Sequence, residues 1–133
     1  MAVQKYSRQR EEIRKHLFGR TDHPTAETIY TEIRMENPKI SLGTVYRNLA
    51  QLESAGEVIR IPVTNGPDHF DGNTNEHYHL ICPNCGSVSD LWMDGVRREL
   101  HKGLEAQRLD ADQIILNVYG CCSNCNGKLQ AEV

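Results

Sequence analysis

The sequence contains no apolar run that approaches the length of a membrane span, and only 38% of its 133 residues are hydrophobic. Its N-terminus, Met1 to Lys5, has no signal-peptide core. These two absences argue against a membrane protein and a secreted one. We therefore expect a soluble, cytoplasmic protein without a membrane partner, whose cysteines stay reduced and available to bind metal.

Two signatures of metalloenzymes are also missing. There is no His-Glu-x-x-His, and no His-x-Glu combined with the Pro-Cys-x-x-Cys of zinc deaminases. No nucleophile–base pair stands out either. We expect that the protein is not an enzyme. Two other classes stay open as alternatives: a metalloenzyme with a catalytic metal on His77 and His79, and a zinc-stapled protein-interaction module.

Charge is divided unevenly along the chain, whose net charge is −3. Residues 1–66 carry 10 Lys and Arg against 8 Asp and Glu, whereas residues 67–133 carry 5 against 10. A basic half beside an acidic half is mild support for a surface that faces nucleic acid.

The first half of the chain predicts three short helices. Ser7 is expected to cap the first, whose inner face carries Ile13 and Leu17. Thr25 caps the second, and Ser41 caps the third, which has a narrow apolar stripe. Gly56 then provides the C-terminal stop of the third helix.

A strand hairpin should follow these helices. Residues 58–61 form a short strand, Asn65-Gly66 is a turn signal, and His69-Phe70 is the returning strand. Three helices and a hairpin predict a winged helix-turn-helix domain over residues 1–66, with a hinge near residues 62–68.

Residues 67–133 predict a small α/β dimerisation domain, so the fold class is α+β. Strands are expected over residues 78–81, 88–91 and 113–119. Asp94 should begin an amphipathic helix with Val96, Leu100 and Leu104 facing inward. The long apolar third strand is a natural element for pairing with a second copy of the chain, which predicts a homodimer.

Four cysteines predict a zinc site that staples this domain. They form two Cys-x-x-Cys pairs, Cys82 with Cys85 and Cys122 with Cys125. Four thiolates suit Zn²⁺ in a closed tetrahedral, structural site. The fifth cysteine, Cys121, is either a small buried residue or a spare nucleophile.

The third helix carries a polar face that could read DNA. Its hydrogen-bonding and aromatic residues lie mostly in the first turns, the part of a recognition helix that enters the major groove. Arg47 can address guanine or phosphate, Asn48 adenine, and Tyr46 a thymine methyl or a phosphate. The expected DNA-contacting residues are Ser41, Thr44, Tyr46, Arg47 and Asn48. The alternative is an ordinary solvated helix face.

The motifs SLGTVYRNL, HPTAETIY, HYHLICPNCG and YGCCSNC occur in this order. They resemble the ferric uptake regulator superfamily over nearly the whole chain, from Ser7 to Cys125. Membership implies a dimeric, metal-dependent transcriptional repressor that binds an inverted-repeat operator in double-stranded DNA. In the family pattern the zinc ligand falls at Cys122, which leaves Cys121 outside the site.

The resemblance is strongest to the peroxide-responsive branch of the family. It implies a regulatory site of three imidazoles and two carboxylates: His23, Asp71, His77, His79 and Asp90. Such nitrogen and oxygen donors suit Fe²⁺ or Mn²⁺. His23 is expected in the winged-helix half and the other four beyond the hinge, so that bound metal fixes the orientation of the two halves.

The same resemblance implies how the signal is read. Asp71 stands where peroxide sensors carry Asp and iron sensors usually carry Glu. With Fe²⁺ bound, hydrogen peroxide is expected to oxidise His23 or His77, which weakens the site, whereas Mn²⁺ should support repression without sensing. The alternative is a repressor of the same family that reports Fe²⁺ availability reversibly.

Overall fold

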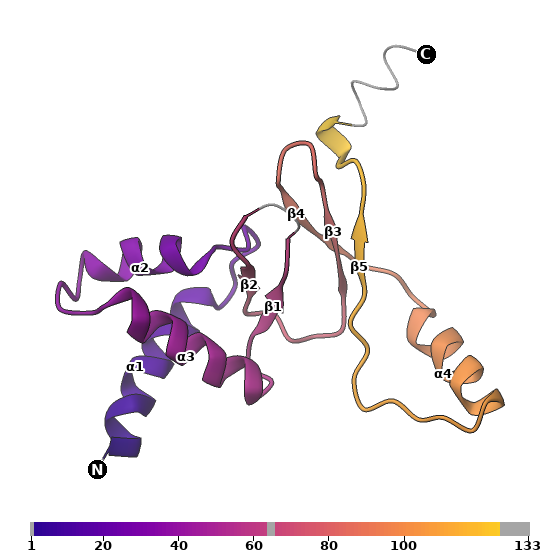
Figure 1. Ribbon diagram of the computed structural model, residues 1–133, viewed down its shortest axis with the longest axis horizontal. Coiled ribbons are helices and arrows are strands. Elements are labelled where there is room, and N and C mark those ends of the chain that lie inside the picture. Colours follow the sequence, from indigo (N-terminus) through magenta and orange to yellow (C-terminus); the bar gives the residue numbers. More distant parts are fainter. Residues whose placement is uncertain (1, 64–65, 126–133) are drawn as a thin grey trace.

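The computed structural model describes the backbone of residues 2–63 and 66–125 and the side chains of residues 8–63 and 66–125. The fold is α+β. Three helices lie on one side, a two-stranded hairpin lies in the middle, and a three-stranded sheet follows, with a fourth helix standing apart (Figure 1).

The N-terminal helices are α1 (Ala2–Leu17), α2 (Ala26–Arg34) and α3 (Leu42–Ser54). The predicted caps of α2 and α3 are confirmed: Thr25 Oγ1 accepts from the Thr28 amide at 3.2 Å, and Ser41 Oγ accepts from the Thr44 amide at 3.1 Å. Gly56, with φ of +75°, follows the end of α3 in the left-handed conformation that glycine tolerates.

The expected start of the first helix at Ser7 is wrong. α1 is already helical at Ala2, so Ser7 lies within it. The residues from Ala2 to Tyr6 contain no proline or glycine and include good helix formers, so nothing stops the helix at Ser7.

One apolar core holds the helices together. Its buried residues come from all three helices, from the segments around them and from the hairpin: Ile13, Leu17, Ala26, Ile29, Ile33, Ile40, Val45, Leu49, Leu52, Val58 and Phe70. Burial of this many branched and aromatic side chains is the main stabilising contribution in the N-terminal half.

The predicted hairpin consists of β1 (Ile59–Ile61) and β2 (His69–Asp71), which pair antiparallel with Arg60 opposite Phe70. The turn expected at Asn65-Gly66 involves Asn65, which lies outside the described residues. Because Phe70 is fully buried in the helical core, β2 packs with the N-terminal half of the chain.

The second sheet has the strand order β4-β3-β5. β3 (Tyr78–Ile81) and β4 (Val88–Leu91) pair antiparallel, within the predicted ranges. β5 (Asn117–Tyr119) pairs parallel to β3 and is shorter than the predicted strand over residues 113–119. β3 begins at Tyr78 and Asn117 pairs with His79, so the residues before Leu116 have no strand beside them.

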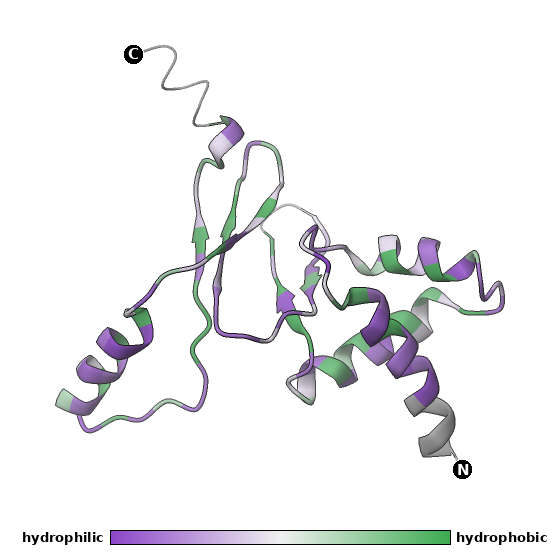
Figure 2. Cartoon of the chain, turned by 180° about the vertical axis from the view of Figure 1, so that it is seen from behind, coloured by the Kyte–Doolittle hydropathy of each residue, from purple (hydrophilic) through white to green (hydrophobic). Residues whose placement is uncertain are grey.

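The fourth helix, α4 (Val96–Ala106), begins after Gly95 and not at Asp94. Its apolar residues were expected to face inward, but none of its eleven residues, all of them described, is buried. Leu100 is 42% exposed, because α4 stands away from the sheet and the helices, with hydrophobic positions between its polar ones (Figure 2). Within one chain, this amphipathic helix has no surface to pack against.

The described helices include none that is both long enough and apolar enough to cross a bilayer.

Gly72 allows the end of β2 to pack closely against the backbone at the end of α1. A Cβ atom at this position would lie 2.9 Å from the Leu17 carbonyl oxygen and 3.0 Å from its carbon, both backbone atoms that cannot move aside cheaply. The close approach explains why the residue after Asp71 is glycine.

We predict that Gly72→Ala lowers the free energy of unfolding by about 1–3 kcal/mol, because overpacking forces the backbone apart. Urea denaturation of the metal-free protein measures the change. Gly103→Ala is the matched control: its Cβ would meet nothing within 4 Å in the exposed helix α4, so stability should stay equal or rise by up to about 1 kcal/mol. Equal stability of the two variants would show that the contact at Gly72 is not tight.

Candidate functional site

The structure gathers the four cysteines of the two Cys-x-x-Cys pairs. Cys82 directly follows β3, Cys85 lies in the connection to β4, and Cys122 and Cys125 follow β5. All four Sγ atoms lie within 4.8 Å of one another, with Cys82 and Cys125 at 3.7 Å and Cys85 and Cys122 at 3.6 Å. Four thiolates about 2.3 Å from a zinc ion have sulfur–sulfur edges of about 3.8 Å, so the spacing fits a tetrahedral site.

The thiols interact strongly with one another. The backbone N–H of Cys125 lowers the pKa of Cys122 to about 6, and the backbone N–H of Cys122 lowers the pKa of Cys82. The neighbouring Cys122 and Cys82 sulfurs raise the pKa of Cys125 to about 12. Four thiolates cannot ionise this close together without a cation, and a divalent metal ion supplies that charge.

Cys121 lies outside the cluster, as predicted from the family pattern. It is partly exposed, and the side-chain nitrogen of Asn84 lies 3.6 Å from its sulfur.

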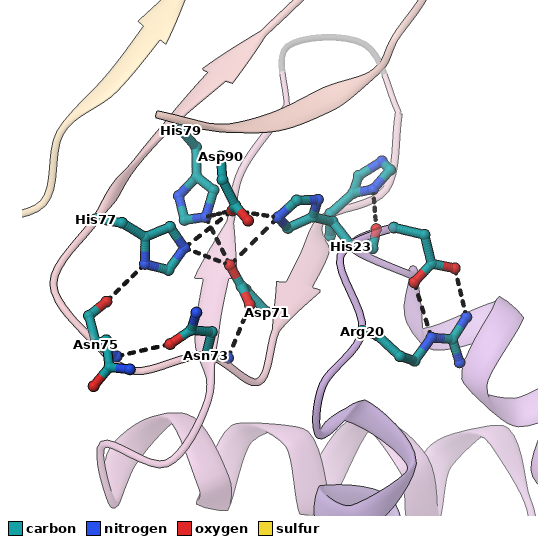
Figure 3. Close-up of polar contacts among 10 residues, drawn as sticks. Arg20, His23, Asp71, Asn73, Asn75, His77, His79 and Asp90 are labelled. Carbon is teal, nitrogen blue, oxygen red and sulfur yellow. Dashed lines mark hydrogen bonds and ion pairs between the residues drawn. The ribbon is translucent and has the colours of Figure 1, made fainter. Parts of the chain in front are cut away.

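The second group of metal-binding side chains is a cluster of three histidines and two aspartates (Figure 3). Asp71 Oδ2 lies 3.3 Å from His23 Nε2, 2.8 Å from His77 Nε2 and 2.9 Å from His79 Nε2. Asp90 Oδ1 faces the same three nitrogens at 2.8, 3.0 and 3.5 Å. The structure therefore brings together all five residues that the sequence predicted. We call them the His/Asp cluster.

The cluster is almost closed to solvent. His23 and Asp71 are buried, as are His77 and His79, while Asp90 is partly buried. Burial raises the pKa of Asp71, but hydrogen bonds from the three histidines and from the Asn73 amide outweigh it and hold the pKa well below its usual range. For His23 burial acts in the opposite direction and lowers the pKa, but hydrogen bonds to the carboxylates of Asp71 and Asp90 outweigh it and raise the pKa overall.

Two separate parts of the fold supply the cluster. His23 precedes α2 and Asp71 ends β2, which packs into the N-terminal core. His77 immediately precedes β3, whereas His79 on β3 pairs with Asp90 on β4. Asp71 was expected beyond the hinge with His77, His79 and Asp90, but it lies on a strand that pairs with β1 and packs into the N-terminal core.

His23 is held in an unusual backbone conformation, with φ of +49°. Its carbonyl oxygen accepts a hydrogen bond from His69 Nδ1 at 2.6 Å, and the Phe70 amide donates to Pro24 O at 2.9 Å. The loop before α2 is thus tied to β2, so His23 and Asp71 form one rigid side of the cluster. The role of His69 was missed in the sequence, where it fits no motif.

Salt bridges fasten the other end of this loop. Arg20 donates to both oxygens of Asp22, at 2.9 and 2.7 Å, and to Glu32 on α2 at 2.6 Å. Arg20 thereby connects the end of α1, the loop and α2, next to His23.

His77 is fixed by three kinds of contact. Its Nδ1 donates to the Asn75 carbonyl oxygen at 2.6 Å, which directs Nε2 toward Asp71 and Asp90 and makes Nε2 the nitrogen that could bind a metal ion. The ring stacks on Trp92, with centroids 4.7 Å apart and planes 18° from parallel. The contact of Trp92 with His77 was not predicted either, because an aromatic residue after a strand carries no specific signal.

The polar face of α3 is exposed over most of its length. Ser41, Tyr46 and Arg47 are exposed and Thr44 is partly exposed. Tyr46 is oriented by Glu27 on α2, whose Oε1 accepts from its hydroxyl at 2.7 Å; this carboxylate raises the pKa of Tyr46.

Asn48, which was expected to contact DNA, does not lie on this exposed face. It is 1% exposed and its amide nitrogen donates to the Thr44 carbonyl oxygen at 2.8 Å, so its side chain faces inward and not toward solvent.

Comparison with known proteins places the chain in the ferric uptake regulator family, whose model matches residues 2–119. The "Peroxide-responsive repressor PerR" of Staphylococcus aureus is 31% identical over 120 residues, which cover 90% of this chain and 81% of that protein.

Two solved structures share its fold. The Campylobacter jejuni peroxide stress regulator superposes with a TM-score of 0.78 at 33% identity, covering 91% of each chain. The ferric uptake regulator of Pseudomonas aeruginosa, solved with manganese, gives 0.71 at 26% identity, covering 86% of this chain and 87% of the other. The chain belongs to the ferric uptake regulator family.

We predict that Cys122→Ser removes the metal ion bound at the four cysteines and destabilises the C-terminal sheet, because one thiolate of the tetrahedron is lost. Metal content of the purified protein, measured by mass spectrometry of the elements, checks this. The neighbouring variant Cys121→Ser should keep its metal. If the two variants lose metal equally, the assignment of ligands at this pair is wrong.

Proposed function

We propose that this protein is a homodimeric, metal-dependent transcriptional repressor that binds operator DNA. The observation that carries the proposal is the His/Asp cluster, in which the N-terminal and C-terminal halves of the chain each supply part of one metal site. A site of this kind can control how the two halves are oriented, and hence whether a DNA-binding surface is presented correctly.

The two metal sites would hold different ions. Cys82, Cys85, Cys122 and Cys125 offer four soft thiolates, which suit a structural Zn²⁺. His23, Asp71, His77, His79 and Asp90 offer nitrogen and oxygen donors, which suit Fe²⁺ or Mn²⁺. Two carboxylates make the second site formally neutral with a divalent ion, which favours a closed, buried environment.

The N-terminal half would act as a winged helix-turn-helix domain, with β1 and β2 as its wing. The N-cap Ser41 and the first turns of α3, with Tyr46 and Arg47 exposed and Thr44 partly exposed, lie where a recognition helix contacts base edges and phosphates. Buried Asn48 is not included in this set. We propose that residues 69–71 function with this domain, because β2 pairs with β1, although the sequence suggested a boundary between residues 66 and 67.

The C-terminal half would form the dimer. Apart from Trp92 and Met93, its exposed large apolar residues lie on α4 and on the segment that leads to and includes β5: Leu100, Leu109, Ile115, Val118 and Tyr119. Much of this segment is hydrophobic in Figure 2. A second copy could cover both elements, which explains why α4 is amphipathic although nothing in its own chain covers it.

The five residues of the His/Asp cluster would control the relative orientation of the two halves. His23 and Asp71 are fixed to the helical core, whereas His77, His79 and Asp90 are fixed to the sheet. These five residues would hold a divalent ion, whose positive charge would keep the two carboxylates and three imidazoles together. Closure of the cluster then favours the orientation in which both copies of α3 fit successive turns of the operator, and DNA tightens metal binding by the same factor.

We predict that His23→Ala abolishes Mn²⁺-dependent operator binding, because it removes an imidazole on the helical side of the cluster. Fluorescence anisotropy with labelled operator DNA measures binding with and without Mn²⁺. Zinc content and the dimer should be unchanged. His101→Ala, on the exposed helix α4, is the control and should behave as the wild type. Full metal-dependent binding by the His23 variant would contradict the proposed switch.

We further propose that the signal is hydrogen peroxide. A cavity of about 310 Å³ is lined by residues of both halves, among them His77 and His79, so that a small solute could lie next to the cluster. With Fe²⁺ bound, an imidazole of His23 or His77 would gain one oxygen atom from peroxide, and the other oxygen would leave as water. An oxygenated imidazole is a poorer ligand, and thiols do not reverse the change.

Peptide mass spectrometry after brief exposure to stoichiometric peroxide tests this proposal. We expect one added oxygen on His23 or His77 in protein loaded with Fe²⁺, and none in protein loaded with Mn²⁺. Intact histidines, with operator binding restored by fresh Fe²⁺, would instead favour the alternative function, a reversible repressor that reports iron availability.

A further inference from the structure

Trp92 is the only tryptophan in the chain, and it lies two residues after Asp90 of the His/Asp cluster. It is 59% exposed, although a large aromatic side chain usually gains stability from burial. Its exposed ring is nevertheless held in one place, because the indole stacks nearly parallel on His77 at 4.7 Å between centroids.

His77 connects this indole directly to the centre of the cluster. Its Nε2 lies 2.8 Å from Asp71 Oδ2 and 3.0 Å from Asp90 Oδ1, and the ring makes an edge contact with His79. Only one imidazole ring therefore separates Trp92 from the carboxylate oxygens. Trp92 therefore lies close enough to be reached by oxidation that begins at the cluster. Its indole is also the most readily oxidised aromatic side chain.

We propose that Trp92 is a site of oxidative modification, hydroxylated by hydrogen peroxide when Fe²⁺ occupies the His/Asp cluster. The inference rests on the peroxide-sensing function proposed above. The O–O bond of peroxide breaks, one oxygen atom is inserted into a C–H bond of the indole, and the other leaves as water. The indole loses two electrons and peroxide gains two, so the reaction balances without another reductant.

Hydroxylation of Trp92 has a different consequence from oxidation of His23 or His77. Trp92 is not one of the five clustered residues, so all of them remain able to bind metal after the indole is modified. Each peroxide molecule that reacts with Trp92 is one that leaves the histidines intact. Trp92 therefore raises the amount of peroxide needed to release the operator.

The test uses the full-length Met93→Leu protein, because Met93 is 51% exposed and peroxide oxidises methionine without iron. Zinc-containing dimers loaded with Fe²⁺ or Mn²⁺ receive limiting peroxide, and fragment ions locate each added oxygen atom. The expected result is one added oxygen on Trp92 in the Fe²⁺ sample and none in the Mn²⁺ sample.

The other outcomes distinguish failure of this inference from failure of the proposed sensing function. Oxygen on His23 or His77 with unmodified Trp92 would overturn this inference and leave the sensing function standing. Equal modification of Trp92 with both metals would overturn it too, because the reaction would not need the iron site. No added oxygen on Trp92, His23 or His77 in the Fe²⁺ sample would overturn the sensing function and this inference together.

A second variant tests the protective role. Trp92→Phe keeps an aromatic ring that can stack on His77 but is harder to oxidise. In the Met93→Leu background at limiting peroxide, we expect a larger fraction of His23 and His77 to gain oxygen and more operator binding to be lost. Unchanged histidine oxidation, with Mn²⁺-dependent operator binding as in the parent, would show that Trp92 takes up no oxidising equivalents.

Discussion

The connection between the two halves of the structure depends on two carboxylate oxygens that each face three imidazole nitrogens. Asp71 comes from the helical half and Asp90 from the sheet, and each contacts histidines from both halves. Without a cation, these buried charges would repel or would have to be neutralised by protons. The cluster therefore couples the orientation of the two halves to whatever positive charge occupies its centre.

The rest of the fold makes this coupling effective. Among the described residues, the helices and strands pack mainly within their own half, and no pair of elements from opposite halves packs extensively. Outside the cluster, the Tyr119 hydroxyl donates to the Pro62 carbonyl oxygen at 3.2 Å across the boundary. Within each half, however, the residues of the His/Asp cluster are rigidly supported, by Gly72 against α1 on one side and by strand pairing of His79 with Asp90 on the other.

Local chemistry made part of this architecture predictable. Thr25 and Ser41 cap helices because their hydroxyls satisfy free amides, and the Cys-x-x-Cys spacing places two thiolates on one ion. The sequence could not show that β2 carries Asp71 into the helical half, because that depends on the burial of Phe70 in a distant core. Nor could it show Asn48 turning inward or His69 and Trp92 supporting the cluster, since single residues outside a motif become meaningful only through three-dimensional contacts.

The weak contact between the halves sets a requirement for the switch. Moving a two-state protein from about 1% to about 99% in one orientation takes about 5.5 kcal/mol of differential binding free energy. An ion that contacted only one half would bind both orientations equally and could shift nothing. Because His23 and Asp71 lie on one half and His77, His79 and Asp90 on the other, separation of the halves would break the contacts of the His/Asp cluster. In the proposed function, most of the metal-binding free energy would then be available to fix the orientation, and damage to one histidine would reduce it.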